Sequence, residues 1–396
     1  MLKDIRTKIN KIYPIFIFLI TTYILYFKTI GSETLEWGIY PYSELLIHYP
    51  DQFVRRGLLG EILLFFTNDN SAINTVQSFV FYNFVIFSFL VFYTSLKFSL
   101  NSAQISLVYV CSFGILNMVI YDYIFHRKEI LVLNFFLFYL SFIRSARFRG
   151  SHILKLTYLL LTLVLTSLIH EGMLIIFTPF YFYILKKDNI GKIFNMSTYK
   201  VYMIVSIFLF VLMALFKGDE NISNNILNSL PSNDIFLLEP HQTHAINAIG
   251  WSIKRGLALT ARLFLSGNVF YWSFVLILIF ITLSFILFEF DLKKTYRYFF
   301  KNFTKRYEFL ILPLIFVVGW DWGRWLITIF YLIFFTVLTD LERDKESTNH
   351  KKNLLPILIF LTLSILTIIP ECCLSSTNPR ILDVFEIYFF EIKFNY

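Results

Sequence analysis

Long runs of apolar residues, separated by short polar segments, recur along the whole chain. The first run covers residues 12–29, and the last ends at residue 370. In helical conformation about 20 apolar residues cross a bilayer, where only a helix or a closed barrel satisfies the backbone. The pattern therefore predicts an all-α polytopic transmembrane bundle of about 11 spans, at residues 12–29, 76–96, 103–122, 129–143, 154–169, 172–185, 200–216, 268–289, 308–319, 324–338 and 354–370.

Basic residues assign the sides of the membrane, because cytoplasmic loops carry an excess of Lys and Arg. Residues 1–11 are basic, and no small-residue cleavage motif follows the first run, which favours an uncleaved first span. The N-terminus is then cytoplasmic and the C-terminus lies outside. The other inner segments lie at Lys97, Arg144–Lys155, Lys186–Lys200, Lys293–Arg306 and Arg343–Lys352.

Two apolar stretches, 154–185 and 308–338, are longer than one span and are interrupted by charge. Each is either one tilted helix or a hairpin of two short helices. Inner-side basic residues flank both ends of each stretch, so the chain must cross an even number of times. We therefore expect two hairpins, with polar tips at residues 170–171 and 320–323 that face outward.

The remaining polar segments are too short for a separate soluble domain. Residues 1–396 are thus predicted to form one integral membrane domain, with its longest outer loops at 30–75 and 217–267. Residues 58–66 are apolar but too short to cross, so we expect an interfacial or re-entrant helix there. Gly57 and Gly60 would ease its entry.

Composition agrees with a membrane protein: 57% of residues are hydrophobic and 16% are charged, against about 25% charged in soluble domains. The net charge of +8 follows the positive-inside pattern, so nucleic acid is not expected as a partner. The three cysteines show no zinc-site spacing. His241 and His244 are a weak metal candidate, and we expect neither a metal site nor a cofactor.

The densest charge in the first outer loop is Asp51-Gln-Phe-Val-Arg55-Arg56-Gly-Leu-Leu-Gly-Glu61. Two adjacent guanidiniums suit a diphosphate, because each can offer a bidentate fork. Asp51 would then serve as a general base or bind the acceptor. The alternative is structural: an Asp–Arg pair that caps an interfacial helix.

Two further outer segments carry ionisable side chains. Asp122 and the run His126-Arg127-Lys128-Glu129 join two spans, and we expect Asp122, Arg127 and Lys128 to bind substrate. His170 and Glu171, at the first hairpin tip, are candidates for acid–base catalysis. The structural alternatives are a snorkelling cluster and a polar pair that closes a tight turn.

The second hairpin tip reads Gly319-Trp320-Asp321-Trp322-Gly323-Arg324-Trp325. Tryptophan rings stack on sugar faces, and carboxylates accept hydrogen bonds from sugar hydroxyls. Trp320, Trp322 and Arg324 are therefore assigned to substrate binding and Asp321 to catalysis, although Trp residues also anchor helices at interfaces. No P-loop, Gly-rich dinucleotide motif or CxxC occurs.

This layout resembles the membrane proteins of bacterial surface-polysaccharide assembly, in particular O-antigen (Wzy-type) polymerases and the wider GT-C glycosyltransferases. The first-loop acid Asp51 and the arginines Arg55, Arg56, Arg127 and Arg324 carry the resemblance. It departs from the family in lacking an arginine-rich periplasmic loop pattern and a close acid pair in the first loop.

The resemblance implies a multi-pass protein of the bacterial inner membrane that transfers sugars from a polyprenyl-diphosphate-linked saccharide at the outer face. The product would be a polymerised surface polysaccharide, O-antigen or capsule. Membrane lipid and other polysaccharide-assembly membrane proteins are the implied partners. A transporter or flippase is the alternative, and a non-catalytic scaffold is a third possibility.

Overall fold

The computed structural model describes most of the chain up to residue 299 and, beyond it, a few residues and the long helix at 322–341. The described residues are 2–31, 38–67, 71–120, 124–144, 152–188, 192–193, 196–216, 218–238, 245–249, 258, 260–261, 268–288, 291–299, 309, 311–313 and 322–341. They form a helical bundle whose only described strands are the two-residue β1 (Lys192–Ile193) and β2 (Met196–Ser197).

Six described helical segments are long and apolar enough to cross a membrane. They are Ile12–Thr29 of α1 (Leu2–Thr29), α4 (Ile73–Lys97), the pair α5 (Ser102–Val110) and α6 (Ile115–Ile120), α8 (His152–Ile169), α10 (Thr198–Leu215) and α18 (Trp322–Leu341). A seventh is possible if α15 (Asn268–Phe288) and α16 (Leu292–Phe299), bent by 106° between Trp272–Phe288 and Leu292–Phe299, form one broken span.

The expected eleven spans are therefore not confirmed. Expected spans 129–143 and 172–185 correspond to α7 (Lys128–Phe138) with the π-helical turn η2 (Tyr139–Ile143), and to α9 (Glu171–Lys187). Helix α7 has 11 residues and α9 has 17, and neither is among the six segments above. Span 354–370 and most of 308–319 lie outside the described residues, and so do residues 320–321 of the second expected hairpin tip at 320–323.

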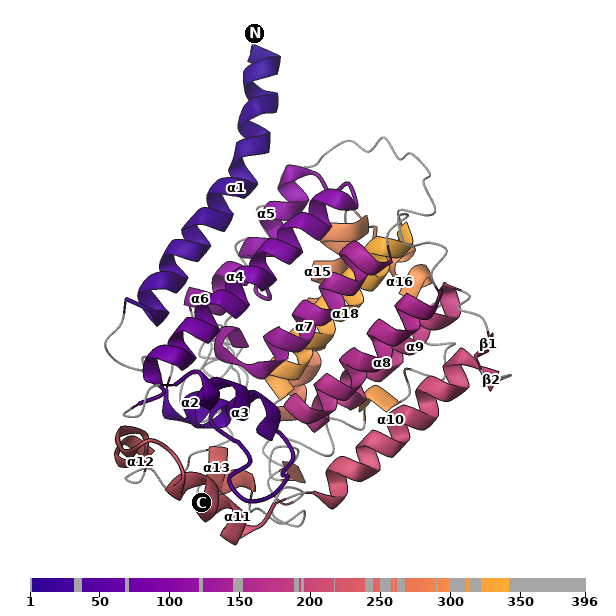
Figure 1. The fold of residues 1–396 in the computed structure, drawn as a ribbon. Helices are drawn as coiled ribbons and strands as arrows, with labels where there is room; N and C mark the ends of the chain where they lie inside the picture. Colours follow the sequence, from indigo (N-terminus) through magenta and orange to yellow (C-terminus); the bar gives the residue numbers. More distant parts are fainter. Residues whose placement is uncertain are drawn as a thin grey trace.

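Helix α18 forms the centre of the bundle, because it is buried along nearly its whole length. It packs against α7, α9 and α15 (Figure 1). Two ionisable residues interrupt its apolar sequence near its ends, Arg324 in the first turn and Asp340 in the last. Their burial inside the bundle requires partners from other helices.

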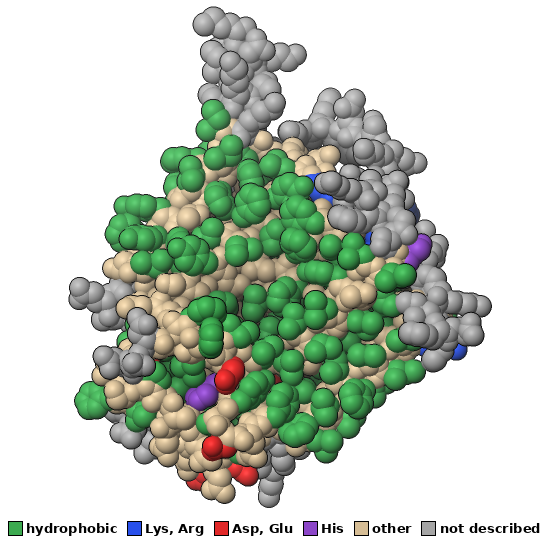
Figure 2. Space-filling model, in the orientation of Figure 1, with side chains coloured by type: hydrophobic (Ala, Val, Ile, Leu, Met, Phe, Trp, Pro, Cys, Tyr) green, Lys and Arg blue, Asp and Glu red, His purple; other side chains and the backbone are tan. Residues whose placement is uncertain are grey.

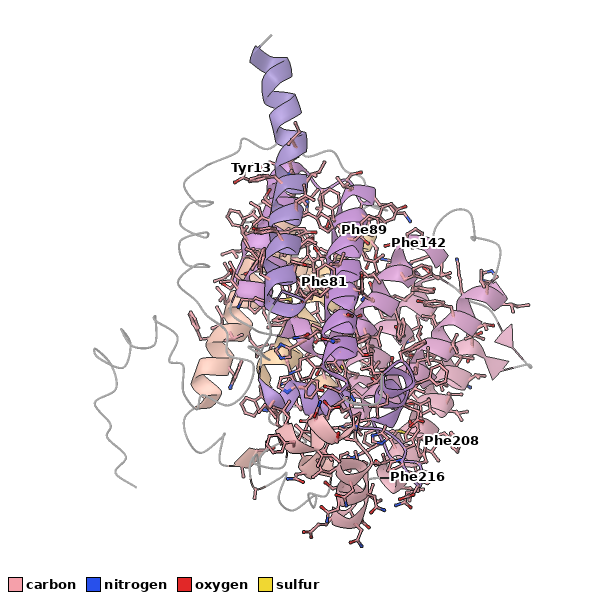
Figure 3. The ribbon with its side chains drawn as sticks, turned by 60° about the vertical axis from the view of Figure 1, so that its left-hand side comes forward. Tyr13, Phe81, Phe89, Phe142, Phe208 and Phe216 are labelled. Carbon is pink, nitrogen blue, oxygen red and sulfur yellow. The ribbon has the colours of Figure 1, made fainter. Side chains whose placement is uncertain are left out.

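The outer surfaces of the peripheral helices are apolar. Tyr13 on α1, Phe89 on α4 and Phe208 on α10 are 56%, 48% and 62% exposed (Figure 3). Figure 2 shows hydrophobic side chains over most of one face, with Asp and Glu near the end where α11 (Glu220–Asn228) lies. Such a surface is stable against lipid tails, in agreement with the membrane class predicted from the sequence.

Short helices gather at the end of the bundle opposite the N-terminus (Figure 1). They are α2 (Ile39–Leu45), α3 (Gly57–Phe65), α11, α12 (Ser232–Leu238) and α13 (Ala245–Ile249). Helix α3 matches the short helix expected at 58–66. A Cβ on Gly60 would lie 2.0 Å from the Ile47 carbonyl oxygen, so glycine permits the close approach of α3 to the chain after α2.

Buried polar contacts join the segment after α10, which contains α12 and α13, to α2. Asp234 of α12 is fully buried and accepts hydrogen bonds from Tyr42 Oη, from Ser71 Oγ at 3.2 Å and from Ala72 N at 2.8 Å. Ser43 Oγ accepts from Ala245 N at 2.8 Å. These contacts hold α2 in place, and the next residue of α2, Glu44, points toward the bundle core.

Candidate functional site

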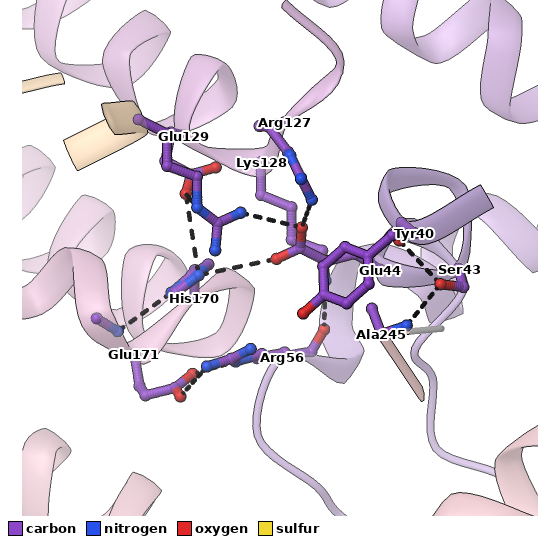
Figure 4. Close-up of polar contacts among 12 residues, drawn as sticks. Tyr40, Ser43, Glu44, Arg56, Arg127, Lys128, Glu129, His170, Glu171 and Ala245 are labelled. Atoms are coloured by element: carbon purple, nitrogen blue, oxygen red, sulfur yellow. Dashed lines mark hydrogen bonds and ion pairs between the residues drawn. The ribbon is translucent and has the colours of Figure 1, made fainter. Parts of the chain in front are cut away.

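Nine ionisable residues from five segments meet where these short helices adjoin the bundle. Figure 4 labels Glu44, Arg56, Arg127, Lys128, Glu129, His170 and Glu171 among them. We call this group the charged cluster. It consists of Glu44, Arg55, Arg56, Arg127, Lys128, Glu129, His170, Glu171 and Arg324.

Glu44, in the last turn of α2, binds two arginines through one oxygen. Its Oε2 lies 2.6 Å from Arg127 Nη1 and 3.2 Å from Arg324 Nη1. The carboxyl is 2% exposed. Burial alone would raise the pKa of Glu44, but the positive charges of Arg324 and Arg127 hold that pKa well below its usual range. Glu44 is therefore an anion at neutral pH.

Arg324 also reaches a second carboxylate. Its Nε lies 3.2 Å from Glu129 Oε1, and the Glu129 side chain is fully buried in the first turn of α7. One guanidinium from the central helix thus joins α2 to α7. A planar group with several donors can serve two carboxylates at once, which a lysine ammonium on its flexible stem does less well.

The double arginine before α3 faces Glu171 at the start of α9. Arg56 donates from Nε to Glu171 Oε2 at 2.8 Å and from Nη2 to Oε1 at 2.6 Å. Arg55 Nη1 lies 3.1 Å from the same Oε1. The backbone of Arg56 has φ 70°, a left-handed conformation that costs energy for a residue other than glycine. Lys128 Nζ donates a hydrogen bond to the backbone carbonyl oxygen of Arg56 at 3.0 Å.

His170 lies at the junction of α8 and α9, and it acts as the N-cap of α9. Its Nδ1 accepts a hydrogen bond from Gly172 N at 3.2 Å. The opposite ring atom, Nε2, lies 3.8 Å from Glu44 Oε1 and 3.9 Å from Glu129 Oε1. Burial, followed by the charge of Arg56, lowers the pKa of His170 to about 3. The ring is therefore neutral at physiological pH.

The charged cluster carries an excess of positive charge. Five of its members are cationic and three are carboxylates, with His170 neutral, which leaves two positive charges in excess among the described residues. Buried ion pairs stay stable only when charges are matched closely. An excess of buried cations therefore favours an anionic ligand, such as a phosphate or diphosphate.

The structure brings together seven of the residues expected to form the site: Arg55, Arg56, Arg127, Lys128, His170, Glu171 and Arg324. It does not bring Asp51 among them. The Asp51 side chain is exposed and accepts a hydrogen bond from Asn225 Nδ2 at 2.9 Å. Trp322 is buried at the start of α18, where its ring lies 6.2 Å from that of Trp272. Asp122, Trp320 and Asp321 lie outside the described residues.

Two carboxylates of the charged cluster had no role assigned from the sequence. Glu44 follows an aromatic segment and precedes Leu45-Leu46-Ile47. An acidic residue among apolar residues is the feature of the sequence that could have identified it as a site residue. Glu129 is the last residue of the charged run at 126–129. The described residues hold no group of three His, Cys, Asp or Glu side chains arranged to bind a metal ion.

A second buried network lies at the other end of α18. Asp340 accepts hydrogen bonds from Tyr183 Oη and, at 3.0 Å, from Tyr298 Oη, and it forms an ion pair with Lys187. Nearby, Arg144 binds Asp188 at 2.8 Å and Thr339 Oγ1 at 2.9 Å. Each charge there has an opposite charge beside it, which is typical of a structural network.

No family model, curated protein or solved structure matches the chain.

Proposed function

We propose that the protein is a membrane glycosyltransferase that acts on polyprenyl-diphosphate-linked sugars at the outer face of the bacterial inner membrane. Its product would be a surface polysaccharide built from repeat units, such as O-antigen or capsule. The observation that carries this proposal is the charged cluster, in which five cations and three carboxylates meet at one end of an apolar bundle.

The chemistry of such a transfer needs few protein groups. A diphosphate at the anomeric carbon is already a good leaving group, and cations stabilise the charge that develops on it. Arg55, Arg56, Arg127, Lys128 and Arg324 supply those cations. The acceptor hydroxyl needs a base and an orienting contact, and the carboxylates and His170 lie in the same group.

The lipid carrier fits the surroundings of the cluster. Apolar helices flank it, so a polyprenyl chain can stay in the bilayer while its diphosphate reaches the arginines. On the positive-inside pattern of the sequence, we place the N-terminus in the cytoplasm and the charged cluster at the outer face.

A transporter or flippase would also bind a lipid diphosphate, and the second buried network at the far end of α18 is the observation that favours it. Between Arg324 and Asp340, however, the buried positions of α18 are mostly apolar, apart from Thr328, Tyr331, Thr336 and Thr339. A route for a charged headgroup along this helix would need more polar positions than these. Glycosyl transfer is therefore the better account.

The two functions differ in where substrate accumulates when the gene is deleted. Loss of an outer-face polymerase leaves single lipid-linked repeat units on the outer leaflet, where an impermeant glycosidase removes their sugars. Loss of a flippase leaves them on the inner leaflet, protected in intact cells. We expect outer-leaflet accumulation together with a missing polysaccharide ladder, and protected units would contradict the proposal.

A further inference from the structure

Three buried polar atoms converge on one point in the charged cluster. His170 Nε2 lies 3.8 Å from Glu44 Oε1 and 3.9 Å from Glu129 Oε1, and the three side chains are at most 2% exposed. Glu44 Oε1 and His170 Nε2 have no hydrogen-bond partner among the described residues, and Glu129 Oε1 has an ion-pair contact with Arg324 Nε but no hydrogen bond there. Leaving such atoms unsatisfied costs about 1–3 kcal/mol each. The spacing suits an oxygen atom that accepts from Nε2 and donates to a carboxylate.

The local structure fixes which ring nitrogen of His170 carries hydrogen. Because Nδ1 accepts the hydrogen bond from Gly172 N, the neutral ring must carry its hydrogen on Nε2. The atom that faces the two carboxylates is therefore a donor. In this arrangement His170 can orient a hydroxyl oxygen, but it has no free lone pair there to accept a proton.

The two carboxylates are not equivalent as proton acceptors. Glu44 Oε2 is 2.6 Å from Arg127 Nη1 and 3.2 Å from Arg324 Nη1. Glu129 contacts a cation through Oε1, which lies 3.2 Å from Arg324 Nε, and its Oε2 accepts no hydrogen bond from another described residue. Close cations lower the proton affinity of a carboxylate, so Glu129 is the stronger base of the pair.

We propose that Glu129 is the general base of the transfer and that His170 Nε2–H orients the acceptor hydroxyl between them. This inference rests on the proposed function. The hydroxyl proton passes to a Glu129 carboxylate oxygen, and the hydroxyl oxygen forms the new bond to the anomeric carbon. The bond from that carbon to the diphosphate oxygen breaks, and its electron pair leaves with the polyprenyl diphosphate. Glu129 later releases the proton to water.

The test compares conservative variants in a deletion strain, with polysaccharide ladder formation and protein abundance as readouts. Glu129→Gln keeps the shape but removes the base, and loss of a general base typically costs about 10²–10⁴-fold in rate. His170→Gln keeps an N–H donor near the Nε2 position without any basic nitrogen, so it should retain at least about one-tenth of the rate, since roughly tenfold corresponds to one lost neutral hydrogen bond. Glu61→Gln is the control, because Glu61 is exposed and lies outside the charged cluster.

Two results would overturn the assignment: transfer by Glu129→Gln above one-tenth of wild type, or His170→Gln as inactive as Glu129→Gln. If Glu129→Gln does not accumulate, Glu129→Asp carries the test, because a base withdrawn by one methylene should slow transfer at least about tenfold. Wild-type transfer by Glu129→Asp would then overturn the assignment.

Binding of undecaprenyl diphosphate to the purified protein separates this inference from the proposed function. Glu129→Gln should bind this probe as wild type does, because the arginines hold the diphosphate. A wild-type protein that neither binds the probe nor supports a ladder defeats the proposed function itself. If the wild-type protein binds the probe and supports a ladder, and Glu129→Gln is also active, only the proposed role of Glu129 is contradicted.

Discussion

Arg56 and Glu171 are 115 residues apart in the chain and form a two-pronged ion pair with contacts of 2.8 and 2.6 Å. The pair joins the turn before α3 to the junction of α8 and α9. It thereby holds His170, the residue before Glu171, beside Glu44 and Glu129. This pair therefore joins two segments of the charged cluster that lie far apart in the chain.

Replacement of Arg56 by Lys should therefore weaken both the fold and the transfer reaction. Lysine supplies a point charge without the planar fork, and we expect transfer to fall by about tenfold or more, as for loss of one charge-assisted hydrogen bond. Arg55→Lys is the matched control, because Arg55 makes a single contact of 3.1 Å with Glu171. Ladder formation and thermal unfolding in detergent measure the two effects. Equal behaviour of the two variants would contradict the account.

Asp51→Asn should leave transfer near the wild-type level. The Asp51 side chain is exposed and binds Asn225, and an asparagine there keeps size and a hydrogen-bonding oxygen. The same ladder assay checks this at normal protein abundance. A loss of transfer comparable to that of Glu129→Gln would return the general base to Asp51.

Asp234→Asn should destabilise the contact between α12 and α2. All three partners of the Asp234 carboxylate donate hydrogen bonds to it, so an amide nitrogen would face a donor, at a cost of about 1–3 kcal/mol. Because α2 carries Glu44, transfer should fall as well. Asp219→Asn is the control, since Asp219 caps α11 through Ile222 N and Asn caps about as well as Asp. If Asp234→Asn changed neither stability nor transfer, α12 would not hold α2 in place.

Because of His170, the protein should become less stable as the pH is lowered. An unfolded histidine titrates near its ordinary pKa of about 6.5, whereas the folded His170 has its pKa lowered to about 3. Below pH 6.5 the unfolded state binds a proton that the folded state does not, so stability declines from there toward pH 3. His170→Gln should remove part of the fall in Tm between pH 7 and pH 5. An unchanged slope in this variant would contradict a buried, neutral His170.

The sequence predicted helices well where the signal is local. Expected spans 200–216 and 268–289 match α10 and α15 within two residues, because apolar length directly reflects bilayer thickness. The apolar run at 103–122 predicts one helix, but the structure has a break at residues 111–114 between α5 and α6. There Gly114 lies against the Tyr109 carbonyl, where a Cβ would approach to 2.4 Å, a tertiary detail that hydropathy does not contain.

The charged cluster was predictable only in part, for a related reason. Arg55, Arg127 and Arg324 stand out because charge beside apolar runs is costly. Glu44 acquires its importance from Arg324, which lies 280 residues away in the chain. Proximity along the sequence made Asp51 a candidate for the same site as the double arginine, whereas in the fold Arg55 and Arg56 contact Glu171.

The central claim is that the charged cluster transfers sugars from a polyprenyl diphosphate. Its most direct test uses purified protein in lipid nanodiscs, supplied with the lipid-linked saccharides extracted from the deletion strain and followed by mass spectrometry. The account predicts a longer lipid-linked saccharide together with one free polyprenyl diphosphate per sugar bond formed, with both products absent from Arg324→Ala. Wild-type protein that leaves the saccharides unchanged, or Arg324→Ala protein that extends them at the wild-type rate, would contradict it.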